Sequence, residues 1–176
     1  MIKTLLLVLA TAIAAVLVYA AFRPATIRVE RRLLIAAPPA TLFPLMDDLH
    51  AFNRWNPYRL KDPTLTDTFE GPSSGPGAVY RWKGNKGVGQ GSMTITEHTP
   101  MSQVVIRLQI LEPFPGDSRV EFNLKPQGAG TEVTWALQDQ QAYIPRLMGI
   151  FFNMDKLIGD DFAIGLERLR KLAEAG

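Results

Sequence analysis

The sequence predicts an α+β protein in which a curved antiparallel β-sheet wraps a long C-terminal α-helix, with a further apolar helix at the N-terminus. From residue 64 to residue 137, apolar residues recur at every second position, the period of a half-buried strand. After about Asp155 they recur at every third or fourth position, the period of a helix. Before both patterns, an uncharged run extends from Thr4 to Phe22.

The uncharged run predicts a transmembrane helix. At about 1.5 Å per residue it would extend roughly 28 Å, close to the thickness of a bilayer's hydrocarbon core. We interpret it as a signal anchor rather than a cleaved signal peptide, because it exceeds the usual signal core and Tyr19 is bulky for a cleavage site. A buried core helix fits less well, since the run has no polar face. We expect a membrane anchor at 1–22 that contacts lipid through 4–22, a linker at 23–26 and one domain at 27–176.

The flanking charges give opposing signals about the side of the membrane. Lys3 favours a cytoplasmic N-terminus, whereas a group of arginines would favour a cytoplasmic domain. The group comprises Arg23, Arg28, Arg31 and Arg32. Because three of these arginines fall in the first predicted strand, we expect a single-pass membrane protein with an extracytoplasmic domain.

The charge balance excludes several classes of partner. Beyond residue 22 the chain has 18 Lys and Arg residues against 17 Asp and Glu, since Lys3 is the only charge before that point. Such a surface has no basic stripe for nucleic acid. The chain has no cysteine and two histidines, His50 and His98, neither with a ligand-spaced partner. We therefore expect neither a metal site nor a cofactor, and the sequence identifies no protein partner.

The first strand is predicted at 27–35, where apolar and charged residues largely alternate, and Pro38-Pro39 ends it. A short helix with one apolar face should follow, and a second helical turn could include 51–54 before the WNPY segment makes an extended exit. That face comprises Leu42, Phe43, Leu45, Met46 and Leu49. Pro44 suits an early turn or a kink in this helix, and Asp47 and Asp48 are expected on its solvent side.

Further strands are predicted at 66–70, 79–83, 91–97, 104–110, 120–124 and 133–137, with short connections that favour antiparallel pairing. The glycine-rich segment GNKGVGQG at 84–91 lies between two of them. It lacks the GxGxxG spacing of a phosphate loop, and a strand rather than a helix follows it. We interpret it as a hairpin turn whose glycines bend a curved sheet.

The last helix is predicted at 155–174. Its apolar stripe comprises Ile158, Phe162, Gly165, Leu166, Leu169 and Leu172. Gly159 and Gly165 each cost about 1 kcal/mol relative to alanine in a helix. They either let the helix lie close on the sheet or leave room for a ligand. Asp160 is expected in solvent, and Asp161 is expected to form a cap or a pair at the helix edge.

Several segments together resemble the SRPBCC superfamily, in its START-like or polyketide cyclase-like branch. They are the strand ending IAAPPATLF, the WNPY exit, the GPGAVYRWKGNKGVGQGSMTITE hairpin, the GTEVTW strand and the final FFNMDKLIGDDFAIGLERL helix. The resemblance spans 27–173 and implies a helix-grip fold, in which the sheet wraps the last helix around a hydrophobic cavity. Members bind lipids, polyketides, sterols or similar apolar ligands, and only some are enzymes.

The implied cavity would be lined by aromatic and methionine side chains, although any one of them could simply fill the core. The candidates are Trp55, Tyr80, Trp82, Met93, Phe114, Trp135, Tyr143, Phe152 and Phe162. We expect a noncatalytic, membrane-tethered binder or carrier of a small hydrophobic ligand.

Two other functions stay open. One is a polyketide cyclase/dehydratase-like enzyme, in which Tyr80, Tyr143 or Asp161 would move protons. The other is a noncatalytic membrane-anchored subunit or interaction module. An inward-facing polar pair would favour the enzyme, a wholly apolar cavity the carrier, and a filled core the subunit.

Overall fold

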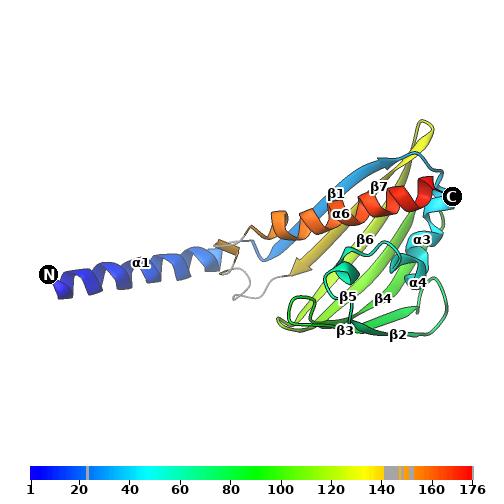
Figure 1. The fold of residues 1–176 in the computed structure, drawn as a ribbon. Helices are drawn as coiled ribbons and strands as arrows, with labels where there is room; N and C mark the ends of the chain where they lie inside the picture. The colour runs from blue at the N-terminus through cyan, green and yellow to red at the C-terminus, as the bar shows by residue number, and fades with distance from the viewer. Residues whose placement is uncertain (23, 141–146, 148, 151–152, 176) are drawn as a thin grey trace.

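The structure, a computed structural model, describes residues 1–22, 24–140, 147, 149–150 and 153–175 (Figure 1). Its helices are α1 (Ile2–Phe22), α2 (Pro39–Leu42), α3 (Pro44–Asp47), α4 (Leu49–Phe52), the 3₁₀ helix η1 (Pro57–Leu60) and α6 (Met154–Glu174). Its strands are β1 (Thr26–Ile35), β2 (Thr66–Glu70), β3 (Val79–Lys83), β4 (Gln90–Thr99), β5 (Gln103–Glu112), β6 (Gly116–Gln127) and β7 (Gly130–Gln140).

These seven strands form one antiparallel sheet in the order β1-β7-β6-β5-β4-β3-β2. Every connection from β2 to β7 joins neighbouring strands, whereas β1 pairs with the distant β7. The pairing of β4 with β5 has two irregularities, next to Gly91 and next to Ile95, and such bulges bend a strand. The sheet curves around α6 (Figure 1). The predicted α+β architecture, with a curved sheet and a C-terminal helix, is confirmed.

Helix α6 buries one face against the sheet. Asn153 caps its first turn by accepting a hydrogen bond from the backbone N–H of Lys156. The buried face follows the predicted stripe and includes Phe162, Leu166 and Leu169. A Cβ added to Gly165 would lie 2.5 Å from Cζ3 of Trp135, so this glycine lets the helix lie close on the sheet.

The segment between β1 and η1 is divided more finely than the short helix that the apolar pattern predicts. It forms three separate turns, because Pro39 and Pro44 each occupy a first helical position, where a missing N–H costs nothing. Asp48 caps α4. The expectation that Asp47 is solvated was wrong: its side chain is buried, and its Oδ1 lies 2.8 Å from Nδ1 of His98. The fold packs the end of β4 against α3. Because Asp47 and His98 are 51 residues apart in the chain, the sequence did not indicate this contact.

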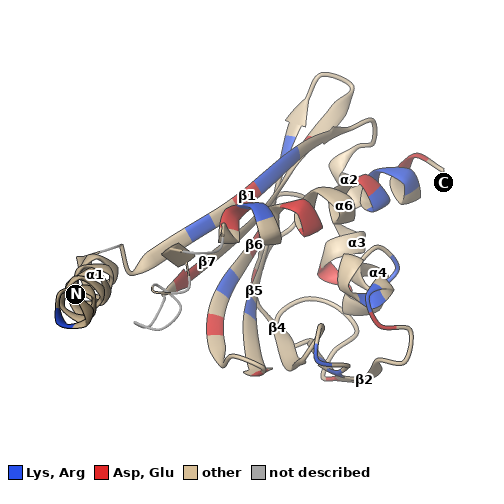
Figure 2. Ribbon diagram, turned by 60° about the vertical axis from the view of Figure 1, so that its left-hand side comes forward, with Lys and Arg blue, Asp and Glu red and all other residues tan. Residues whose placement is uncertain are grey.

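Helix α1 is long and apolar enough to span a membrane, and Ala20 is its only described buried residue. A signal sequence near the N-terminus can also satisfy this test of length and composition. Elsewhere, basic and acidic residues intermingle along the strands (Figure 2). Arg107 pairs with Asp117, and Arg119 pairs with Glu121 and Glu97.

Candidate ligand cavity

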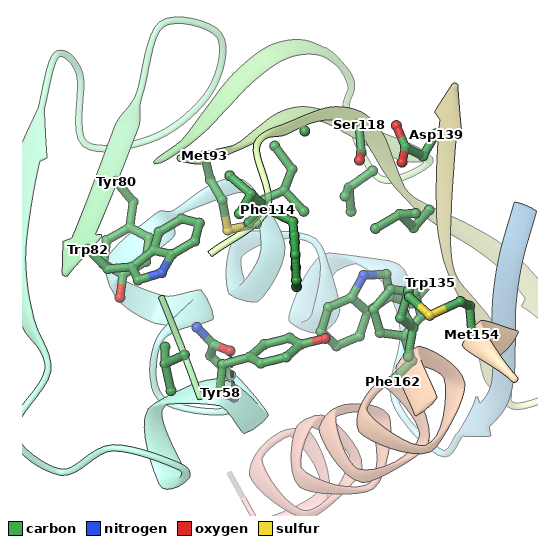
Figure 3. Close-up of a pocket in the computed structure, with 18 of the residues that line it drawn as sticks. Tyr58, Tyr80, Trp82, Met93, Phe114, Ser118, Trp135, Asp139, Met154 and Phe162 are labelled. Atoms are coloured by element: carbon green, nitrogen blue, oxygen red, sulfur yellow. Dashed lines mark hydrogen bonds between the residues drawn. The ribbon is translucent and has the colours of Figure 1, made fainter. Parts of the chain in front are cut away.

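A cavity of about 510 Å³ lies between the sheet and α6 (Figure 3). Its walls come from β1, from β3 to β7, from η1, from the β5–β6 connection and from the first half of α6. The volume is within the range of roughly 300–1,000 Å³ that is usual for small-molecule sites. The fold therefore encloses space for a small ligand as well as a packed core.

Most of the candidate residues that the structure describes line this cavity. They are Tyr80, Trp82, Met93, Phe114, Trp135 and Phe162. Trp55 does not line it. Instead, its ring is fully buried in the core, where its indole N–H donates to the backbone oxygen of Leu45 at 2.8 Å. Tyr143 and Phe152 lie outside the described residues.

Strand alternation places the aromatic wall on β3 and β4. Tyr80 and Trp82 are two residues apart, so their side chains share a face of the sheet, and their rings lie 5.7 Å apart. Met93 is the cross-strand partner of Tyr80, and Gly91 is the partner of Trp82. A Cβ at Gly91 would lie 2.7 Å from the Trp82 ring, so the glycine makes room for the indole.

The opposite wall is built around Trp135 on β7. Its ring stacks on Phe162 of α6, with centroids 4.2 Å apart and an angle of 10° between the planes. The rings of Phe52 and Trp55 contact it edge-on, with centroids 6.0 and 5.4 Å away. Because Gly165 also approaches the ring, the orientation of Trp135 is fixed from several sides.

Two tyrosine side chains, Tyr58 and Tyr80, belong to the cavity walls. Burial raises the pKa of Tyr58, and the nearby carboxylate of Asp161 raises it further. Burial also raises the pKa of Tyr80. Both hydroxyls therefore stay protonated at neutral pH. Asp161 itself is directed to Lys61, with its Oδ2 2.6 Å from Nζ, which confirms the expected pair at the helix edge.

Sequence reasoning missed a polar pair at one end of the cavity, formed by Ser118 and Asp139. The two residues are cross-strand partners on β6 and β7, and their side chains lie beside each other in Figure 3. Burial raises the pKa of Asp139 above its ordinary value. The sequence did contain a sign of this residue's position. Asp139 follows Trp135 and Leu137 at every second residue, so strand alternation places it on the same face of the sheet.

The cavity lining contains an acidic side chain but no basic one among the described residues. Among the described residues that line the cavity, Asp139 is the only carboxylic acid, and there is no Lys, Arg or His. Phe114 and Gly116 also line the cavity and are exposed, so the cavity opens at the β5–β6 connection. The rest of the wall is almost entirely apolar.

Comparison with known proteins agrees with this geometry. The family model described as polyketide cyclase/dehydrase and lipid transport matches residues 26–174. No curated protein matches the chain. Among solved structures, a Thermobifida fusca protein is 22% identical, with a TM-score of 0.61, over 83% of this chain and 92% of its own.

Two more solved structures share the fold. A Chromobacterium violaceum protein is 17% identical, with a TM-score of 0.60, over 86% of this chain and 99% of its own. The Aha1 dimer from Colwellia psychrerythraea is 15% identical, with a TM-score of 0.61, over 84% of this chain and 96% of its own. With the match across 26–174, the chain belongs to the polyketide cyclase/dehydrase and lipid transport family, which confirms the SRPBCC-type resemblance of its sequence.

Proposed function

We propose that the chain is a membrane-tethered binder or carrier of a small hydrophobic ligand, such as a lipid or a polyketide. The observation that carries the proposal is the cavity of about 510 Å³, whose wall is apolar except near Asp139, Ser118 and a few buried polar tips. Burying the apolar surface of a ligand there is worth about 25 cal/mol per Å² removed from water. On this reading, residues 27–176 are the ligand-binding domain.

The tether supports uptake of ligand directly from the bilayer. Ile27 lines the cavity, yet only residues 23–26 separate it from the end of α1. An extended chain covers at most about 3.5 Å per residue, so part of the cavity wall would lie within roughly 20 Å of the bilayer surface. Phe114, which is 63% exposed, adds an apolar side chain at the mouth.

The proposal is tested by identifying what copurifies with the full chain from its native host, using mass spectrometry. Leu108→Trp should fill the cavity and remove the copurifying molecule, because Leu108 lines the wall. Gln109→Trp is the matched control, since strand alternation turns the next residue of β5 to the other face. If the wild-type chain carries no apolar molecule and takes up no apolar dye, a noncatalytic membrane-anchored subunit becomes the better account.

The side of the membrane can be tested separately. The chain contains no cysteine, so Lys125→Cys introduces a single thiol at an exposed position. A membrane-impermeant maleimide should label this thiol in intact cells if the domain is extracytoplasmic. Labelling that occurs only after the cells are permeabilised would reverse the proposed orientation.

The Ser118–Asp139 pair favours a second candidate, a polyketide cyclase/dehydratase-like enzyme. A carboxylate whose pKa is raised by burial is a suitable general base for removing a proton next to a carbonyl group. This predicts exchange of the α-protons of a bound ketone in D₂O, followed by NMR and abolished in Asp139→Asn. Exchange at the uncatalysed rate in the wild-type chain would rule out this role.

A further inference from the structure

The indole N–H of Trp135 has no hydrogen-bond partner in the described structure, although the side chain is only 3% exposed. Buried indoles normally donate, as Trp55 does to the oxygen of Leu45. A donor left unsatisfied in an apolar environment costs about 1–3 kcal/mol. Trp135 lines the cavity, and its nitrogen, which has almost no accessible surface of its own, lies on the edge of the ring (Figure 3).

The ring cannot easily rotate to find a partner elsewhere. Phe162 stacks on one face with centroids 4.2 Å apart, and the rings of Phe52 and Trp55 contact the indole in T-shaped arrangements. Gly165 lies so close that a single added carbon would collide with Cζ3. The packing therefore holds an unused donor in a fixed direction, which is the preorganisation that a specific ligand contact requires.

The charges of the lining indicate what kind of acceptor the donor would meet. An anionic head group would find no described Lys, Arg or His in the wall, and Asp139 at one end would repel it. Removing an unpaired carboxylate from water is also costly. A neutral acceptor avoids both penalties, and a carbonyl oxygen is a strong neutral acceptor.

We propose that the ligand is a neutral lipophile with a carbonyl oxygen, and that this oxygen accepts a hydrogen bond from the indole N–H of Trp135. The inference rests on the proposed binding function and adds the ligand's chemical class. Along β7, Trp135 and Asp139 are four residues apart, or roughly 13 Å. The carbonyl contact is therefore distinct from the Ser118–Asp139 pair.

The test compares two ligands and two side chains, with the full chain in lipid nanodiscs. The ligands 9-fluorenone and fluorene share a rigid tricyclic shape and differ by one carbonyl group. Trp135→Phe removes the N–H donor. Trp82→Phe is the matched control, because Trp82 lines the same cavity and loses the same atoms. Empty nanodiscs correct for partitioning of each ligand into lipid.

The ratio of the fluorene Kd to the fluorenone Kd should fall about 5- to 10-fold in Trp135→Phe and stay unchanged in Trp82→Phe. In NMR spectra of the wild-type chain, fluorenone should move the Trp135 indole proton downfield, and fluorene should not. An unchanged ratio together with an unmoved proton overturns the hydrogen bond. If Trp135→Phe does not fold, the wild-type spectrum decides alone.

A second pair of ligands tests the neutral character. Methyl dodecanoate should bind the wild-type chain at least about tenfold more tightly than ionised dodecanoate. Tighter binding of the anion would overturn the assignment. If none of the four ligands binds, the proposed function fails together with this inference. If fluorene and fluorenone bind but neither their Kd ratio nor the Trp135 indole proton responds as expected, the binding function stands and only the carbonyl contact is refuted.

Discussion

Gly165→Ala directly tests the contact between α6 and the sheet. The new Cβ would lie 2.5 Å from Cζ3 of Trp135 and 3.2 Å from Cδ of Pro57. Apolar carbons are most stable about 3.5–4.0 Å apart, so the helix or the ring must move by about 1 Å. Because Trp135 is stacked on Phe162, the ring has no free direction in which to retreat without disturbing the cavity wall.

Two opposing effects set the size of the change. Replacing glycine by alanine in a helix interior gains about 1 kcal/mol of helix propensity. Overpacking a rigid contact costs about 1–3 kcal/mol, and the fixed ring favours the upper half of that range. The free energy of unfolding should therefore fall by about 1–2 kcal/mol. For a chain of this size, that corresponds to a Tm lower by about 2–8 °C.

The measurement is thermal unfolding of the full chain in detergent micelles, followed by near-UV circular dichroism. Ala163→Gly is the matched control, since Ala163 lies on the exposed side of the same turn. It should lose about 1 kcal/mol through propensity alone. A Tm for Gly165→Ala equal to or above that of the wild-type chain would show that the contact with Trp135 is not tight.

A chain that begins at Ala25 should stay soluble without detergent and unfold cooperatively on heating, because α6 and the sheet bury each other's apolar faces. A broad, gradual transition would contradict this. Asp48→Ala should lower the free energy of unfolding by about 1 kcal/mol, because Oδ1 of Asp48 accepts from two N–H groups at the start of α4. Asp48→Asn should retain most of that stability, and equal denaturant midpoints for the wild-type chain and Asp48→Ala would rule out the cap. Asp139→Asn should stabilise the chain near neutral pH, because a pKa raised above 3.8 makes wild-type stability fall as pH rises through that window. The gain should vanish in denaturation at about pH 3, and a gain independent of pH would refute the linkage.

Much of the fold could be predicted because its patterns are long and regular. Strand 79–83 has its predicted bounds, and the last helix, predicted at 155–174, begins one residue earlier, at Met154. The segment after β1 could not be predicted in the same way. Its apolar spacing is helical, but Pro39 and Pro44 each begin a new helical turn, so the predicted short helix is divided into separate turns. The buried Asp47–His98 contact joins α3 to the end of β4, and nothing in the sequence indicates that these two segments pack together.

The candidate site was predictable only in part. Aromatic residues on inward-facing strand positions, such as Tyr80 and Trp82, do line the cavity. Trp55 does not, because a sequence cannot distinguish a ring that faces open space from one enclosed by other rings. Asp139 was missed because a polar residue after an apolar series usually marks the end of a strand. The unpaired N–H of Trp135 depends on three-dimensional packing, to which composition and periodicity are insensitive.

The pairing of β1 with β7 has a consequence for how the chain matures. Ile35 pairs with Thr131, so the first strand must wait for roughly 100 further residues to be synthesised before its partner exists. At about 5–20 residues per second, this leaves β1 without its neighbour for about 5–20 s during translation. Such long-range pairing slows folding, and an unpaired strand edge invites association with other chains. The strand beside α1 is therefore the strand of the nascent domain that waits longest for its hydrogen-bonding partner.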